Sequence, residues 1–228
     1  MKSAVALVTA AAMAWLSAPA DAKCMQLELR PTLLTTKVQV TPAGGGIVVG
    51  TQGAGRDDKT ESAADVSKWK IRGGKKLETP VVTTLAPGLV LYSTPGSGDL
   101  VNARSKRLGT LTRTKAALPE LEAPKAVTIK HSGSEVRRWQ EEDTLVELTG
   151  TVPDGAIAMI LYDAKGTALT WNIANPGAVA VRVYSFGHCD VANGTRAPSI
   201  GDQVTLAWVD RNGRLSPMTK PIAVVKAE

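Results

Sequence analysis

The chain has 228 residues, 43% of them hydrophobic and 21% charged, with a formal net charge of +6. This balance excludes a disordered or low-complexity chain, and the frequent Val, Thr, Gly and Pro favour strands and turns over helices. Beyond the N-terminus no apolar stretch approaches the roughly 18 residues of a membrane span. We therefore expect a soluble mature protein with no integral membrane segment.

The first 22 residues have the pattern of a secretory signal peptide. Lys2 precedes an apolar run of 13 residues from Ala4 to Leu16, which is too short to cross a bilayer as a helix. Ala20-Asp21-Ala22 then offers the small-x-small pattern that signal peptidase accepts, and Ala18-Pro19-Ala20 offers a second cut. We predict a signal peptide over residues 1–22 and a secreted or periplasmic protein that begins at Lys23.

Two cysteines remain after cleavage, Cys24 and Cys189. An exported chain with an even cysteine count usually pairs them, so we predict one disulfide between the N-terminus and the C-terminal half. The bridge would close a loop of about 165 residues and contribute at most roughly 5 kcal/mol by chain entropy. The alternative, a lipoprotein with a modified Cys24, is disfavoured because the charged Lys23 stands where a lipoprotein signal needs a small residue.

The first elements of the mature chain are short and rich in apolar residues. Residues 26–40 alternate apolar and polar side chains and predict one extended entry strand. Residues 42–46 combine Pro with three Gly and predict a turn, and residues 47–49 predict a short buried strand. Residues 50–65 have little apolar content, so we expect an exposed, mobile loop there.

Residues 68–72 show a clear period-2 pattern. Trp69 and Ile71 fall on one side and three cations fall on the other, which predicts a strand with one buried face. Residues 80–85 and 89–93 flank a Pro-Gly turn, so we expect two consecutive strands.

The end of the N-terminal half leads into a linker. Residues 95–99 predict a loop with a flexible centre, and residues 108–114 predict a further strand. Residues 118–124 contain two prolines, which remove ladder donors and favour extended backbone, so they predict a stiff linker. We expect one domain on each side of it, residues 23–117 and residues 125–228.

The C-terminal half has the more regular pattern. Seven short strands separated by marked turns fit an immunoglobulin-like (Ig-like) sandwich. Residues 134–142 are the one stretch that could form a helical turn. The expected strands are residues 126–130, 144–148, 156–162, 168–173, 178–184, 203–209 and 221–225.

The last hairpin carries a resemblance to a known family. Residues 204–217 alternate apolar and polar side chains and then read Asp-x-x-Gly-x-x-Ser-Pro, which resembles the closing strands of bacterial fibronectin type III domains. Val204, Leu206 and Trp208 should point to the core, and Asn212-Gly213 should supply the positive φ angles of a tight turn.

The N-terminal half carries a second resemblance. Residues 31–49 are similar to the start of bacterial Ig-like domains of secreted proteins. The resemblances imply an all-β fold of two Ig-like or fibronectin-like β-sandwiches in tandem, and they imply no shared activity.

Candidate catalytic and metal-binding residues are few. His188 stands beside Cys189 and Asp190, and the other histidine is His131. Neighbours along a strand point to opposite faces, so a structural disulfide beside an exposed His is favoured over a Cys–His nucleophile. The spacing of these residues matches no metal-binding motif. We predict no catalytic residue, no metal and no cofactor.

Charge distribution is more informative. From residue 68 to residue 115, ten cations stand against two anions, a net +8 in a chain that totals +6. A basic patch attracts anionic polymers such as lipopolysaccharide, acidic glycan or nucleic acid, while the plainer interpretation is a solubilising face that protects a sheet edge. The candidate polyanion-binding residues are Lys68, Lys70, Arg72, Lys75, Lys76, Arg104, Lys106 and Arg107.

The sequence therefore predicts an exported, non-catalytic binding, adhesion or envelope-associated protein, and it does not identify the ligand or the partner. One alternative is a basic-patch binder of anionic polymers, with an anionic glycan or the envelope surface as partner. A second alternative is a small secreted hydrolase whose site residues are scattered along the chain. A pocket with converging carboxylates, or with Ser and His, would favour the hydrolase, and a flat surface would favour the binding module.

Overall fold

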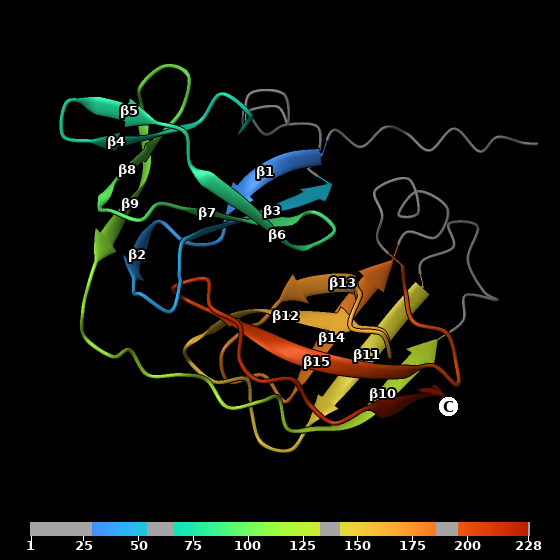
Figure 1. Ribbon diagram of the computed structural model, residues 1–228. Helices are drawn as coiled ribbons and strands as arrows, with labels where there is room; N and C mark the ends of the chain where they lie inside the picture. The colour runs from blue at the N-terminus through green and yellow to red at the C-terminus, as the bar shows by residue number, and fades with distance from the viewer. Residues whose placement is uncertain (1–28, 54–65, 133–141, 186–195, 228) are drawn as a thin grey trace, which may run out of the picture.

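The computed structural model describes residues 29–53, 66–132, 142–185 and 196–227, and strands dominate these residues (Figure 1). The fold class predicted from the sequence, all-β with two sandwiches, is confirmed. No helix in the described ranges is long and apolar enough to cross a membrane. The signal peptide, Cys24, Cys189 and His188 lie outside the described residues, so the predictions made for them remain predictions.

The N-terminal half is a sandwich of two sheets. We call them sheet A and sheet B. Sheet A has the strand order β1 (Leu29–Leu33), β3 (Ile47–Gly53), β7 (Leu89–Ser93) and β6 (Val81–Ala86). Sheet B has the order β2 (Lys37–Val40), β9 (Arg107–Arg113), β8 (Gly98–Val101), β4 (Lys70–Gly73) and β5 (Lys76–Glu78).

The facing sides of sheets A and B enclose the first apolar core. Both sheets follow the period-2 rule, so every second side chain points inward. Trp69 and Ile71 are buried in this core as the sequence predicts, with exposed fractions of 3% and 2%. The core residues are Val38, Val40, Ile47, Val49, Trp69, Ile71, Tyr92, Leu100 and Leu111.

The C-terminal half is a single seven-stranded sheet that folds over on itself. Its strand order is β13 (Ala168–Ile173), β12 (Ala156–Tyr162), β15 (Gln203–Asp210), β16 (Ile222–Lys226), β10 (Ala126–Ser132), β11 (Glu142–Leu148) and β14 (Ala180–Ser185).

Two residue pairs join β15 to β16, and this short pairing is where the sheet turns over. The fold brings β10, β11 and β14 over β12, β13 and β15 and encloses a second core, with Met159, Leu161 and Trp208 on one side and Ile129 and Val146 on the other. The inward orientation that the sequence predicts for the last long strand is confirmed.

A third apolar core lies between the two halves, and the sequence does not predict it. The outer face of sheet A packs on the outer faces of β12, β13 and β15, so β12 and β15 are buried on both sides. This double burial explains their nearly continuous apolar sequence. The residues of this interface are Val48, Ala86, Leu89, Leu91, Ala158, Ile160, Tyr162, Trp171, Ala207 and Val209.

Three expectations for the N-terminal half are wrong. Residues 26–40 are not one strand, because the chain crosses from sheet A to sheet B between β1 and β2. At this crossing the buried Thr35 hydroxyl oxygen accepts the Val48 N–H at 2.9 Å. Residues 50–53 continue β3, and residues 98 and 99 begin β8 instead of lying in a loop. The pattern misses β5 because its three residues are too few to show a period.

The domain division at residues 118–124 remains a prediction. In the described residues, strand pairing stays within residues 29–113 and within residues 126–226. The linker does not stand free of the halves, since Leu121 packs against the second core and Arg214 binds the carbonyl oxygens of Leu118 and Pro119.

Candidate functional site

Strand β4 displays the first cations of the candidate site. Its side chains alternate between the core and solvent, so Lys70 and Arg72 lie on the outer face of sheet B while Ile71 points inward. Trp69 packs on Tyr92 of sheet A with ring centroids 5.4 Å apart, which fixes the strand against the opposite sheet. The charged side chains therefore project from a rigid, well-packed element.

Sheet order brings the second group of cations beside the first. Lys70 on β4 pairs with Val101 on β8, and Val101 pairs with Arg107 on β9. The condition that the sequence could not test, that these strands are neighbours, is met. Lys70 and Arg107 consequently lie at the same end of sheet B.

The β8–β9 turn holds two further cations in place. Asn102 is buried, and its side-chain oxygen accepts the N–H groups of Arg104 and Lys106, each at 3.0 Å. Ser105 between them has a φ of 58°, a left-handed conformation that a non-glycine residue rarely adopts. Within the described residues no carboxylate pairs with Arg104, Lys106 or Arg107.

Lys75 and Lys76 do not join this group. Lys75 lies in the β4–β5 turn and Lys76 begins β5, where it pairs with Gly73 at the opposite end of β4 from Lys70. Lys76 also forms an ion pair with Glu78 at 3.2 Å. We define the basic face as the outer side of sheet B and its β8–β9 turn, with the residues Lys68, Lys70, Arg72, Arg104, Lys106 and Arg107.

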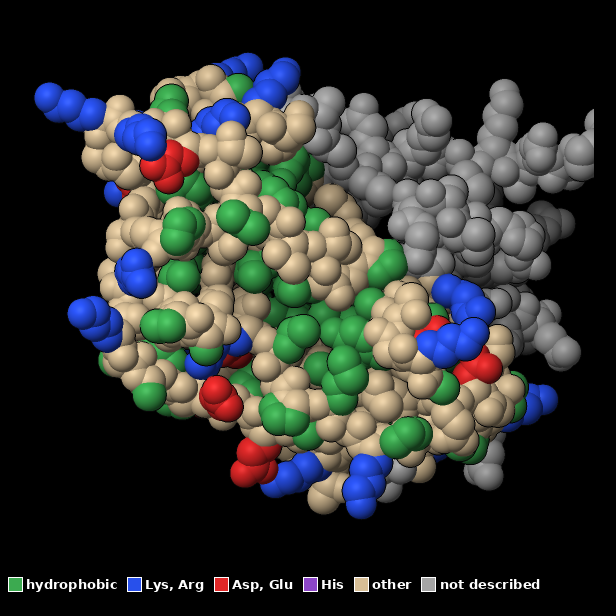
Figure 2. Space-filling model, in the orientation of Figure 1, with side chains coloured by type: hydrophobic (Ala, Val, Ile, Leu, Met, Phe, Trp, Pro, Cys, Tyr) green, Lys and Arg blue, Asp and Glu red, His purple; other side chains and the backbone are tan. Residues whose placement is uncertain are grey.

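Figure 2 shows cations gathered over the end of the N-terminal half that carries β4 and β5 in Figure 1. Sequence reasoning missed Lys37, which lies on the exposed side of β2 and pairs in register with Thr110 of β9. Lys37 joins this sheet only because β2 pairs in parallel with β9, whose residues lie 73 positions later in the sequence.

Asp99 introduces one negative charge into the basic face. It pairs in register with Arg72 on one side and Thr110 on the other. One Arg72 guanidinium nitrogen lies 3.8 Å from an Asp99 carboxylate oxygen, and the Thr110 hydroxyl donates to the other oxygen at 2.9 Å. Asp99 therefore offsets Arg72, and the positive field is strongest toward Lys70 and the β8–β9 turn.

Three features of the described residues bear on the hydrolase and metal-binding alternatives. No group of three or more His, Cys, Asp or Glu within these ranges could hold a metal ion. His131 is buried, with its Nδ1 3.1 Å from the Thr144 hydroxyl on the neighbouring strand. A shallow groove of about 440 Å³ lies between residues 122–126 and residues 218–222. At the groove, the Glu122 carboxylate lies 2.7 Å from the Lys125 ammonium. This hydrogen bond lowers the pKa of Glu122 from its ordinary value, so the two side chains form an ion pair whose charges offset each other.

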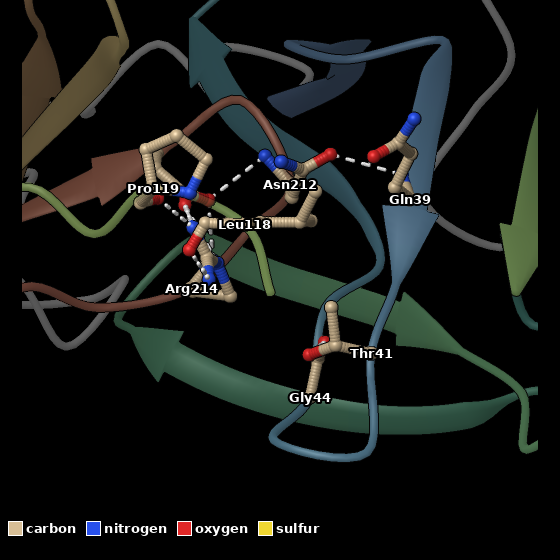
Figure 3. A network of polar contacts seen from close by, with 8 residues as sticks. Gln39, Thr41, Gly44, Leu118, Pro119, Asn212 and Arg214 are labelled. Carbon is tan, nitrogen blue, oxygen red and sulfur yellow. Dashed lines mark hydrogen bonds and ion pairs between the residues drawn. The ribbon is translucent and has the colours of Figure 1, made fainter. Parts of the chain in front are cut away.

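The hairpin of residues 204–217 has a structural role between the two halves (Figure 3). Asp210 accepts the N–H groups of Asn212 at 2.8 Å and Arg214 at 2.9 Å, and its carboxylate binds the Arg214 guanidinium at 2.7 Å. Gly213 has a φ of 75°, but Asn212 does not adopt the positive φ that the sequence suggests. The Asp210 carboxylate organises the turn in place of that second left-handed residue.

The same turn reaches the N-terminal half. The Asn212 side-chain oxygen accepts the Gln39 N–H at 2.9 Å, and the Asn212 carbonyl accepts the Gly46 N–H at 2.8 Å. A Cβ at Gly213 would overlap Leu91 of sheet A, so only glycine allows this approach. The turn, with Arg214 bound to the linker, therefore fixes how the two sandwiches sit together.

Comparison with protein-family models and with curated proteins finds no match in either. Among solved structures, the chain is similar to the BSP domain of a biofilm associated protein, with 12% identity, 87% of this chain covered and a TM-score of 0.30. It is also similar to SGBP-B from the Bacteroides ovatus mixed-linkage glucan utilization locus, with 13% identity, 86% covered and a TM-score of 0.23. The chain spans 29% and 46% of the lengths of these two chains.

Proposed function

We propose that this chain is an exported, non-catalytic binding module of the adhesion or envelope-associated type, and that its basic face binds an anionic polymer. The observation that carries the proposal is the convergence of Lys70, Arg104, Lys106 and Arg107 at one end of sheet B. Lipopolysaccharide, acidic glycan and nucleic acid all present repeated anionic groups that such a face can bind.

The rigidity of the basic face supports binding. Trp69 and Ile71 fix β4 from beneath, and Asn102 fixes the β8–β9 turn through two backbone N–H groups. A preorganised set of cations loses less conformational entropy on binding than the same cations on a flexible tail.

Heparin affinity tests the proposal. In the triple variant Arg104→Ser, Lys106→Ser, Arg107→Ser, we expect heparin binding, measured by calorimetry at low salt, to weaken by roughly tenfold or more. The matched control variant Lys165→Ser, Arg211→Ser, Lys220→Ser removes three exposed cations from the C-terminal half and should bind nearly as the wild type does. Because counterion release drives such binding, wild-type affinity should fall steeply with added salt.

A second variant separates position from charge. Asn102→Ala keeps every cation but removes the acceptor that orders the β8–β9 turn, so we expect a smaller loss of heparin affinity at unchanged net charge. Equal losses in the sheet B triple variant and in the C-terminal control variant would show that binding follows net charge alone, and this result would overturn the proposal.

A further inference from the structure

Strand β6 is an unprotected sheet edge. Among the described residues it is the last strand of sheet A and pairs with β7 alone. Val81 and Val82 are 56% and 51% exposed, and Thr83 and Thr84 are exposed as well. Consecutive residues of a strand point to opposite faces, so β6 is open on both faces at its N-terminal end as well as along its edge.

The other strands at sheet edges carry protection. The β2 edge is capped where Gln39 donates its N–H to Asn212, and β5 is three residues long with Lys76 and Glu78. Asn172 on β13 donates its side-chain amide to the Arg182 carbonyl of β14, so one side-chain hydrogen bond links the two edge strands of the seven-stranded sheet. Strand β1 contains Pro31, which has no N–H to offer.

Strand β6 has no cap and no charged residue, and its pairing with β7 is regular from Val81 to Thr84, with a β-bulge only between Thr84 and Ala86. Its six residues, Val-Val-Thr-Thr-Leu-Ala, contain no charge and no proline, and four of them are β-branched. Natural proteins blunt exposed edges with charge, proline or short length, because an unpaired edge is a template for another strand. An edge strand with unpaired backbone N–H and C=O groups can bind an extended peptide, which then adds to the sheet as a further strand.

We propose that β6 binds an extended segment of a partner polypeptide by strand addition, with acidic residues at the end of that segment next to Val81. The charges around β6 favour an acidic partner. Lys70 extends toward the residues that precede β6, where its ammonium donates to the Thr79 hydroxyl at 3.0 Å. A second copy of the chain would bring two strongly basic sandwiches together, so it is the less favourable occupant.

The added segment would run antiparallel to β6. Alternate residues of β6 direct their N–H and C=O groups away from β7, and these groups would bind the backbone of the partner. Val81 and Val82 would contact partner side chains on opposite faces, which favours β-branched residues in the segment. In this direction the C-terminal end of the segment lies beside Val81, where its carboxylates would be near Lys70. The inference rests on the sheet edge and does not depend on binding of an anionic polymer.

Fluorescence polarisation with the full mature chain tests this inference. The probe is a labelled peptide of three Thr-Val repeats followed by Asp-Glu-Asp, and the comparison peptides carry N-methyl groups on alternate backbone nitrogens in either register. N-methylation keeps charge and side chains but removes edge donors, so we expect one of the two methylated peptides to lose binding.

Substitutions in the protein locate the binding site. In the double variant Val81→Ser, Val82→Ser, peptide affinity should fall by roughly fivefold or more, because strand propensity and apolar contact are both reduced. Leu77→Ser on β5 is the matched control, since Leu77 is equally exposed at 55% and lies on a protected edge.

Two results would overturn the inference. If both methylated peptides bind as tightly as the unmethylated probe, charge alone attracts the peptide to the protein. Dimerisation of the wild type in light scattering that the Val81→Ser, Val82→Ser variant abolishes would make a second copy the occupant. Loss of heparin binding in the Arg104, Lys106 and Arg107 variant, with peptide binding retained, would separate this site from the proposed function.

Discussion

Asp210 and Arg214 form a buried ion pair that holds three segments at once. Their side chains are 10% and 12% exposed, and the Arg214 guanidinium also donates to the carbonyl oxygens of Leu118 and Pro119. A buried charge is costly unless it is paired and hydrogen-bonded. Here the two charges pair with each other, and both side chains also form hydrogen bonds with backbone groups. The position of the linker therefore depends on one arginine.

Arg214→Ala should lower the free energy of unfolding by about 3 kcal/mol, because it leaves the Asp210 carboxylate buried without its cation. Urea denaturation followed by tryptophan fluorescence would measure the change. Arg211→Ala, in the same turn but with an exposed side chain, should change stability by less than about 0.5 kcal/mol. Equal effects of the two substitutions would contradict the assigned role.

At the scale of elements, charged residues join β10 to β11. The Lys130 ammonium lies 2.9 Å from one Glu147 carboxylate oxygen, and the Thr128 hydroxyl donates to the other. The hydrogen bond from Lys130, followed by that from Thr128, holds the pKa of Glu147 below its ordinary value of 4.5. Both strands belong to the same face of the C-terminal sandwich, so the contact links two elements by charge as well as by backbone pairing.

The pH dependence of stability should report this pair. A lowered pKa in the folded state means that ionised Glu147 stabilises the fold above the ordinary pKa of 4.5, and that this contribution is lost as the pH falls through the folded-state pKa. The stability difference between the wild type and Glu147→Gln should therefore shrink as the pH falls below about 4.5. Urea denaturation between neutral and acidic pH would measure it. In a Lys130→Ala background the pH dependence of this difference should be weaker, and an undiminished dependence would contradict the pairing.

The molecule as a whole is a stack of strand layers joined by the apolar core between its halves. Gly50 of β3 lies against the indole of Trp171 on β13, and the Trp171 N–H donates to the Pro87 carbonyl at 3.1 Å. A Cβ at Gly50 would overlap that ring, so the halves approach this closely only because residue 50 has no side chain. We therefore expect the two sandwiches to unfold together.

Gly50→Ala should destabilise the interface by roughly 1–3 kcal/mol, the usual cost of overpacking, and separate the unfolding of the two halves. Calorimetry should then show a broadened or divided transition where the wild type shows one. Gly96→Ala is the matched control, because a Cβ there would meet nothing within 4 Å. Identical thermograms for Gly50→Ala and the wild type would show that the halves unfold independently of this contact.

The sequence alone predicts much of the strand content, and it does so best in the C-terminal half. The predicted ranges for β12 and β13 agree with the structure, because alternating or continuous apolar residues between Gly and Pro turns are local signals. The inward orientation of Val204, Leu206 and Trp208 follows from the same period of two. The burial of Trp69 and Ile71 under the cations of β4 could be predicted for the same reason.

Only the tertiary structure decided which outer faces meet, which edges remain open and which cations converge. The Gln39–Asn212 hydrogen bond joins residues 173 positions apart, and β2 pairs with residues of β9 that lie 73 positions later, so no local pattern encodes either contact. The pattern of a strand predicts which of its side chains share a face. Which sheet packs against that face depends on chain topology and on the packing of whole sheets. This is why the sequence could count the basic residues, while the sheet order determined that Lys70 and Arg107 lie together and that Lys75 and Lys76 lie at the other end.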